Sequence, residues 1–340
     1  MRRFFFSSKG VSATLALLFG LIVTVSGAWA KSAGGFAGVE YLSSDSQTSR
    51  QEVEKMLGLH HGASYESAER ALERLRDKLE QRRMHANLDI VDGDKDEFYV
   101  SIDIVKAGVA GDAPTRKLEF PHRVFLTNTK PLVLLEQLET RRMQLQEQGR
   151  PTEVVYKDGI KHYSDVACDR LVDQLLVVTP LVRGQLHQMI ASDPDPKRRM
   201  AGIELLNWAG QPVGDAVVVV PAINDVDADV RVVAAKYVMA RFDLLPDRFP
   251  WTQLIEAYAF QLARPSHRDR ITGLACLSAL TKTRPELTYN VKVYSEERLK
   301  QLSEQSAIPA IRTRSQDLLA QVGNVKGPKS KVSPGEFNGF

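Results

Sequence analysis

The stretch DPKRRMAGIELL at residues 195–206 decides the fold, because variants of it recur further along the chain. The variants lie at residues 227–238 (DADVRVVAAKYV), 266–274 (SHRDRITGL) and, more weakly, 311–315 (IRTRS). Alignment of the first two stretches places Arg199 opposite Arg231. Recurrence at roughly 30 to 45 residues, with one helical hairpin in each unit, is typical of an α-solenoid.

Aspartates and arginines recur at fixed places in these units. Asp195 and Asp227 each precede a predicted helix, where a carboxylate accepts hydrogen bonds from the first free backbone N–H groups. Arg199 and Arg231, with Arg270 in the third unit, are expected to bond carbonyls or aspartates of the adjacent unit. We therefore predict a structural role for these five residues.

The units resemble HEAT-like repeats, whose inner turn often reads Asp-Pro-Asp ahead of an arginine. Residues 193–196 (DPDP) and 225–227 (DVD) fit this pattern, whereas the third and fourth units depart from it. The resemblance implies a mainly α-helical solenoid over residues 164–323 with a concave surface that grips other proteins. Most aromatic residues on its amphipathic helices are expected in the core, and Trp208 and Trp251 are candidates for the concave surface.

Residues 38–106 show a different pattern, which alternates strands with two helices. The predicted elements are a strand at residues 39–42, a helix at about 49–57, a helix from residue 64, and strands at 86–91 and 97–105. The last two strands alternate apolar and polar residues and are joined by Asp92-Gly93-Asp94, which predicts a hairpin. The order β-α-α-β-β predicts an α+β domain in which both helices cover the apolar face of a small sheet.

The middle of this domain resembles a polypeptide-transport-associated (POTRA) domain. The likeness lies in MLGLHHGASY at residues 56–65, followed by AERALERL at residues 68–75. That family shares the order of elements and a leucine, glycine, leucine, two residues, glycine hinge between its helices, which residues 57–62 match. The resemblance implies that the domain binds polypeptide, often by adding an extended segment to an exposed sheet edge. The candidate partner-binding residues at the sheet edges are Val39, Tyr41, Asn87 and Asp89.

Three other segments lie between and after these two domains in the sequence. Residues 107–130 contain several glycines and prolines and are predicted to be a linker. Residues 131–163 are predicted to form a helix and a small β-hairpin that turns on Asp158-Gly159 and leans on neighbouring helices. Residues 324–340 are rich in lysine, proline and glycine and are predicted to be a disordered tail.

The amino terminus has the pattern of an export signal. A basic leader with Arg2 and Arg3 precedes an apolar run at residues 11–25, which closes on Ala28-Trp29-Ala30. Small residues at these positions predict cleavage after Ala30 and a periplasmic protein, by either the general or the twin-arginine export route. The alternative is an uncleaved membrane anchor, because residues 11–29 are long enough to cross a bilayer.

Composition narrows the class of protein further. Loss of residues 1–30 would leave 42 Lys and Arg against 42 Asp and Glu, and this balance argues against a nucleic-acid binder. The two cysteines, Cys168 and Cys276, could pair in an oxidising compartment, but we expect two separately buried thiols.

No chemical motif of an enzyme stands out. The seven histidines lack metal-ligand spacing, and Asp225, Asp227 and Asp229 lack the glycine and distal glutamate of a calcium loop. We therefore predict no catalytic, cofactor or metal residues. The leading hypothesis is a non-enzymatic periplasmic scaffold whose partners are envelope proteins or peptides, with no small-molecule substrate and with membrane contact only through partners or an uncleaved signal. The alternatives are a component of a membrane-associated envelope transport or assembly machine, and a HEAT-like lyase.

Overall fold

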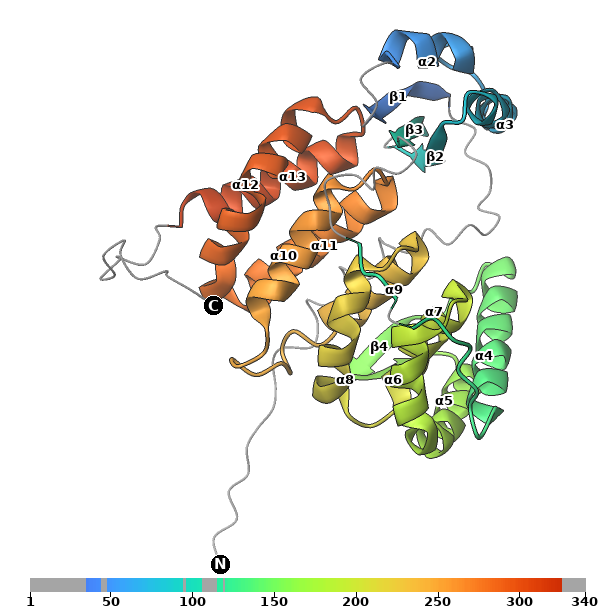
Figure 1. Cartoon of the computed structure of the whole chain (residues 1–340), viewed down its shortest axis with the longest axis vertical. Coiled ribbons are helices and arrows are strands. Elements are labelled where there is room, and N and C mark those ends of the chain that lie inside the picture. The colour runs from blue at the N-terminus through green and yellow to red at the C-terminus, as the bar shows by residue number, and fades with distance from the viewer. Residues whose placement is uncertain (1–34, 44–47, 94–95, 106–114, 119, 326–340) are drawn as a thin grey trace, which may run out of the picture.

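The computed structural model describes residues 35–43, 48–93, 96–105, 115–118 and 120–325. The predicted export signal and all but the first residues of the predicted tail lie outside the described residues. The fold is mixed α+β, with a small sheet near the amino terminus and helices through the carboxyl-terminal part (Figure 1).

The N-terminal unit, residues 36–105, has its elements in the predicted β-α-α-β-β order. They are β1 Phe36–Ser43, α2 Arg50–Leu57, α3 Tyr65–Gln81, β2 His85–Asp92 and β3 Phe98–Val105. The strand order is β1-β3-β2, with β1 parallel and β2 antiparallel to β3. Both β1 and β2 are therefore edge strands.

Local signals set the bounds of the two helices. Ser49 accepts a hydrogen bond from the Glu52 N–H and caps α2, and Ser64 caps α3 in the same way. Gly58 ends α2 with a φ of 65°, a left-handed conformation that glycine adopts without a steric penalty. The apolar stripes of both helices pack on one sheet face, as predicted, in a cluster that includes Val53, Leu57, Leu72, Leu75, Leu79, Phe98, Val100, Ile102 and Ile104.

A long helix and a hairpin follow. Helix α4 spans Lys130–Glu147, and β4 Val154–Lys157 pairs with β5 Ile160–Tyr163. The predicted turn on Asp158 and Gly159 is present, with φ values of 51° and 77°. The indole Nε1 of Trp208 donates to the Lys161 carbonyl at 2.8 Å, which anchors the hairpin to the helices.

The rest of the described chain is helical. Its helices are α5 Val166–Val178, α6 Arg183–Ser192, α7 Pro196–Leu205, α8 Pro212–Val219, α9 Ala228–Met239, α10 Trp251–Ala263, α11 His267–Thr283, α12 Thr288–Gln305 and α13 Pro309–Gly323. Successive helices pack as pairs: α6 with α7, α8 with α9, α10 with α11, and α12 with α13. The second members α7, α9, α11 and α13 also pack on one another in that order, so the pairs are stacked (Figure 1).

Pro221 interrupts one of these helices. The run Val217-Val218-Val219-Val220-Pro221 predicts a kinked helix and not an isolated strand. In the structure α8 ends at Val219 and a 3₁₀ helix, Val220–Asn224, follows directly. Proline has no N–H group for the bond to the preceding turn, so regular α-helical bonding ends there.

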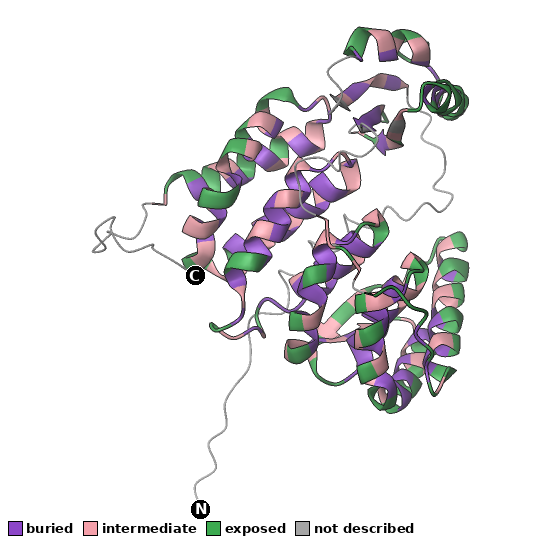
Figure 2. Ribbon diagram, viewed as in Figure 1, coloured by how far each residue is buried: buried purple, intermediate pink, exposed green. Residues whose placement is uncertain are grey.

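Buried residues form two clusters, one in the N-terminal unit and a larger one that runs through the stacked helices (Figure 2). Cys168 and Cys276 are both buried and unpaired, as predicted. Burial raises the pKa of the Cys168 thiol to about 11 and that of Cys276 to about 12. Both thiols therefore stay protonated near neutral pH and pack as small apolar groups.

Part of the predicted linker is packed against the helices. We call residues 115–118 and 120–129 the strap. The backbone N–H groups of Arg116 and His122 donate to the carbonyls of Asn224 and Ser192, at 2.6 and 3.1 Å. The strap thus crosses the turns that precede α9 and α7, in front of the helices in Figure 1.

Candidate protein-interaction surface

The edge of β2 has backbone groups that point away from the sheet. The Gly93 N–H donates to the Glu97 carbonyl at 2.7 Å, in register with the pairing of Asp92 and Phe98. In an antiparallel pair, residues bonded to the partner strand alternate with residues that are not. Odd-numbered residues of β2 therefore bond β3, and the even-numbered residues direct their N–H and C=O groups outward. The outward residues are Ala86, Leu88, Ile90 and, at the end of the strand, Asp92.

The hairpin of β4 and β5 follows the same rule. Ser164 is a bonded residue, because its N–H donates to the Glu153 carbonyl at 3.0 Å. The odd-numbered residues of β5, Lys161 among them, should therefore direct their carbonyls away from β4. The Lys161 carbonyl does face away from β4, because Trp208 donates to it from the helical side.

The two edges of the N-terminal sheet differ in how far they are covered. On β1, the Phe36 N–H donates to the Ala63 carbonyl, and the Arg50 guanidinium donates to the Val39 carbonyl at 3.0 Å. On β2, no other backbone within the described ranges bonds to the outward residues. The side chains of Ala86, Leu88 and Ile90 are half-buried and pack against the N-terminal cluster. The longer open edge is therefore that of β2, and it is apolar.

The candidate residues of the first strand have side chains that are largely covered. Val39 is 5% exposed and belongs to the N-terminal core, which corrects the expectation that its side chain contacts a partner. Tyr41 is half-buried, and its hydroxyl donates to the Thr48 carbonyl at 2.7 Å. Both side chains lie on the face that α2 and α3 cover, as do those of Leu88 and Ile90, and β1 is itself an edge strand.

Asn87 and Asp89 of β2 lie on the opposite face and point toward the stacked helices. The Asn87 Nδ2 donates to the Pro265 carbonyl at 2.7 Å. Burial raises the pKa of Asp89, although the nearby Arg268 and Arg270 partly oppose this effect. These two side chains therefore face the helices, while the backbone of β2 provides the open edge.

Both tryptophan candidates are core residues. Trp208 is fully buried, and Trp251 is 6% exposed and packs against Phe242 and Phe249. The expectation that they line a concave surface is therefore corrected. Their helices are apolar on more than one side, so a periodic pattern does not show which aromatic residues reach the surface.

Arg199 and Arg231 make the contacts that the repeat pattern predicts. Arg199 donates from Nε and Nη2 to the two carboxylate oxygens of Asp225, at 3.0 and 2.6 Å. Arg231 binds Asp269 in the same two-pronged way, at 2.8 and 2.5 Å. Each arginine joins its own helix pair to the next one, and the planar guanidinium fork fixes the angle between them.

The aspartates at the turns cap the helices that follow. Asp195 accepts a hydrogen bond from the Lys197 N–H at 2.9 Å, and Asp227 accepts from Asp229 and Val230 at 3.0 Å each. These carboxylates stabilise the starts of α7 and α9.

The third aligned arginine binds the N-terminal sheet instead of the next helix pair. Arg270 donates from Nη1 and Nη2 to Asp103 of β3, at 3.0 and 3.3 Å, and its Nη2 lies 3.2 Å from Oε1 of Glu40 in β1. The exposed fractions of Arg270, Asp103 and Glu40 are 0%, 1% and 4%. Burial raises the pKa of Asp103, and the neighbouring guanidinium only partly offsets this rise.

The Glu40 carboxylate also reaches the start of α13. Its Oε2 accepts hydrogen bonds from the Ser306 hydroxyl at 2.5 Å and from the Ile308 N–H at 3.2 Å. The polar face of the sheet is therefore buried against the third and fourth helix pairs. We call Glu40, Asp103, Arg270 and Ser306 the junction. The sequence shows Glu40 and Asp103 only as acids within apolar strands and does not indicate their partners.

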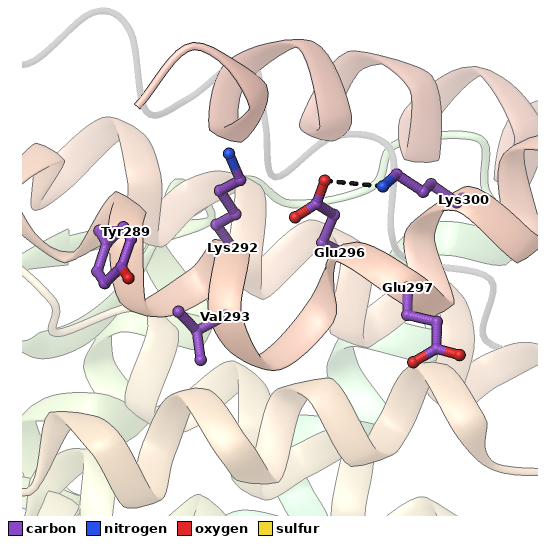
Figure 3. A pocket seen from close by; sticks show the side chains of 6 residues that line it. All are labelled: Tyr289, Lys292, Val293, Glu296, Glu297 and Lys300. Carbon is purple, nitrogen blue, oxygen red and sulfur yellow. Dashed lines mark ion pairs between the residues drawn. The ribbon is translucent and has the colours of Figure 1, made fainter. Parts of the chain in front are cut away.

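Helix α12 carries a hollow on its surface that belongs to one helix alone (Figure 3). It is lined by Tyr289, Lys292, Val293, Glu296, Glu297 and Lys300. Lys300 Nζ lies 2.9 Å from Glu296 Oε1, and the hydrogen bond between them lowers the pKa of that carboxyl. Two lysines balance two glutamates at helical spacing, which is typical of a solvated helix face.

Among the residues that the structure describes, no three His, Cys, Asp or Glu side chains converge as a metal site would require. None of the helices in the described ranges is both long and apolar enough to cross a bilayer. In comparisons with family models, curated proteins and solved structures, the chain has no match.

Proposed function

We propose that this protein is a non-enzymatic interaction scaffold of the bacterial envelope, and that an extended segment of a partner protein adds to the edge of β2. The observation that carries the proposal is the open edge at Ala86, Leu88 and Ile90, whose N–H and C=O groups point away from β3. A strand that pairs with these residues gains backbone hydrogen bonds, and its apolar side chains cover the half-buried Leu88 and Ile90. The POTRA-like order of the N-terminal unit supports the same mode of binding.

The stacked helices, in this proposal, form a HEAT-like solenoid that serves as a frame. The arginine contacts from Arg199 to Asp225 and from Arg231 to Asp269 support this assignment, because they recur between successive helix pairs. The junction then holds the sheet on the frame through Arg270. A sheet edge that is already fixed in place loses less conformational entropy on binding than a mobile one.

The proposed place of action is the periplasm. Its support is the basic leader, the apolar run at residues 11–25 and the Ala28-Trp29-Ala30 sequence, which together suit export and cleavage. The partners would then be envelope proteins or peptides that present an extended segment.

The test removes one outward donor from β2 and keeps the fold. Leu88→Pro deletes the outward N–H, which an edge strand tolerates, whereas Leu88→Ala shortens the side chain and keeps the N–H. A photo-reactive residue is placed at position 86 of the full chain in living cells, and the cross-linked protein is identified. We expect one reproducible adduct that Leu88→Ala weakens and Leu88→Pro abolishes. The same photo-reactive residue at Val293 on α12 is the position control.

A specific result would refute the proposal. If the adducts at position 86 survive Leu88→Pro unchanged, or if they match those at Val293, then no strand adds at this edge. Circular dichroism melting curves of both Leu88 variants check that a lost adduct does not reflect unfolding.

A further inference from the structure

The strap holds two phenylalanines out into solvent. Val124 and Leu126 face inward and are 4% and 8% exposed, whereas Phe125 between them is 76% exposed. Phe120 is 88% exposed and has a φ of 45°, a left-handed conformation that is rare for a bulky residue. The alternation and the unusual turn both direct aromatic side chains away from the core.

The strap cannot easily turn these side chains inward, because its backbone is anchored along its length. Asp193 accepts a hydrogen bond from the Val124 N–H at 3.1 Å, and Gln185 accepts one from the Thr127 N–H at 3.0 Å. Near the other end, the Arg116 guanidinium donates to Asp225 at 2.6 Å. Two large apolar side chains are therefore kept in water by a fixed scaffold, which marks an interaction site.

Basic residues lie near the two phenylalanines in the sequence. Lys117, Arg123 and Lys130 are exposed, and the Arg123 guanidinium lies over the Phe125 ring at 5.9 Å. Among the strap residues that the structure describes, none is acidic; Glu119 lies outside them. With Glu119 counted, residues 115–130 contain four Lys and Arg against one acid. Arg116 is paired with the buried Asp225, which leaves three basic residues against one acid, so this segment is positively charged.

We propose that the strap is a peripheral contact with an anionic phospholipid bilayer. Aromatic side chains favour the interface between headgroups and acyl chains, and lysine and arginine beside them are attracted to anionic headgroups. The phenylalanines protrude instead of lining a groove, which suits insertion into a soft interface. A protein partner would need a matching apolar recess with an acidic rim.

The proposal extends one expectation from the sequence, which allows membrane contact only through partners or an uncleaved signal. The strap would add a contact within the folded part of the chain. The inference does not rest on the proposed strand addition, because the strap and β2 are separate surfaces. It agrees with the alternative in which the protein belongs to a membrane-associated envelope machine.

The test is vesicle sedimentation with the full chain purified from cells, so that any amino-terminal segment contributes equally to every variant. The probes are vesicles of phosphatidylcholine alone and of equal parts phosphatidylcholine and phosphatidylglycerol. Phe120→Ser with Phe125→Ser is expected to lower partitioning to the anionic vesicles by at least about tenfold. Arg123→Gln is expected to lower it by about fivefold at low salt and by less at high salt. Val293→Ser with Tyr294→Ser on α12 is the matched control, because these side chains are 61% and 41% exposed.

A second variant reports on insertion directly. Phe125→Trp places an indole on the strap, and its emission should shift to the blue on anionic vesicles and be quenched by brominated acyl chains. The proposal fails if the wild-type chain binds anionic vesicles no better than the double phenylalanine variant. It also fails if the α12 control weakens binding equally, or if the indole at position 125 shows no shift while the protein is bound.

Discussion

The Ser306 hydroxyl donates a hydrogen bond to the Glu40 carboxylate at 2.5 Å, and this bond joins β1 to the start of α13 across 266 residues of chain. The position of Ser306 explains the contact. Arg312 donates to the Ser306 carbonyl, just as Arg231 donates to the Asp225 carbonyl six residues before it. Ser306 thus occupies the place that an aspartate has in the second helix pair. Glu40 of the sheet supplies the carboxylate that the fourth pair lacks.

Removal of Arg270 should be far more damaging than removal of its neighbour Arg268. Arg270→Met leaves Glu40 and Asp103 buried without a counter-charge, and loss of one partner of a buried pair costs about 3–5 kcal/mol. Arg268 pairs with Asp229 at the surface, with side chains 39% and 55% exposed, so Arg268→Met should cost at most about 1 kcal/mol. Urea denaturation measures both free energies of unfolding. Equal losses would show that the junction does not hold the sheet in place.

A carboxylate moved from β1 to the turn before α13 should restore part of the lost stability. Glu40→Ser alone leaves Arg270 with fewer partners, and Ser306→Asp alone brings a second carboxylate against Glu40. The double variant places one carboxylate where the second helix pair has Asp225. The double variant should lose less unfolding free energy than the sum of the two single losses, by about 0.5–3 kcal/mol. Strictly additive losses would mean that Glu40 does not stand in for the missing aspartate.

The anchor of the strap should depend on pH through Asp193. Burial disfavours its charge, but hydrogen bonds from Arg198 and from the Asp195 and Val124 N–H groups outweigh burial and hold the pKa of this carboxyl below its ordinary value of 3.8. Because the pKa of Asp193 is lower in the folded state than in the unfolded state, its charge stabilises the fold at pH values above the ordinary pKa. This stability is lost as the pH falls through the pKa of the folded state.

Asp193→Asn is the variant that checks this sign. It should reduce the free energy of unfolding by about 1.5–3 kcal/mol at neutral pH, because hydrogen bonds to a charged group are lost. The difference from the wild-type protein should shrink as the pH falls below 3.8. A difference that stays constant down to the acid transition would contradict the role of this charge. Asp195→Asn is a suitable control, since asparagine also caps helices.

The sequence predicts the elements of this fold because their signals are local. Ser49, Gly58 and Ser64 set helix ends within a few residues of each cap. The hairpin turn at Gly159 depends only on the left-handed backbone conformation of that glycine. The arginine contacts are also predictable, since Arg199 meets its partner Asp225 at the start of the next aligned stretch of sequence. These signals act over distances that a repeat or a turn already defines.

The junction and the strap could not be predicted in this way. Asp103 and Arg270 meet across 167 residues, and no periodicity links a strand of one unit to a helix of another. In the strap, Val124, Phe125 and Leu126 form a continuous apolar run, which hides the alternation that buries its first and third members and exposes Phe125. Only the packed structure shows which of these three side chains is left in water.

Amide exchange of β2 in the free protein tests the open edge without any partner. The N–H groups of Asn87 and Asp89 face β3 and should exchange slowly, whereas those of Leu88 and Ile90 face outward and should exchange quickly. Nuclear magnetic resonance resolves the four rates. The expected result is fast and slow exchange in strict alternation along the strand. Uniform protection would mean that the edge is already covered in the folded chain. In that case strand addition would require displacement of the covering segment, and the cross-linking result at position 86 would have to be interpreted as a competition.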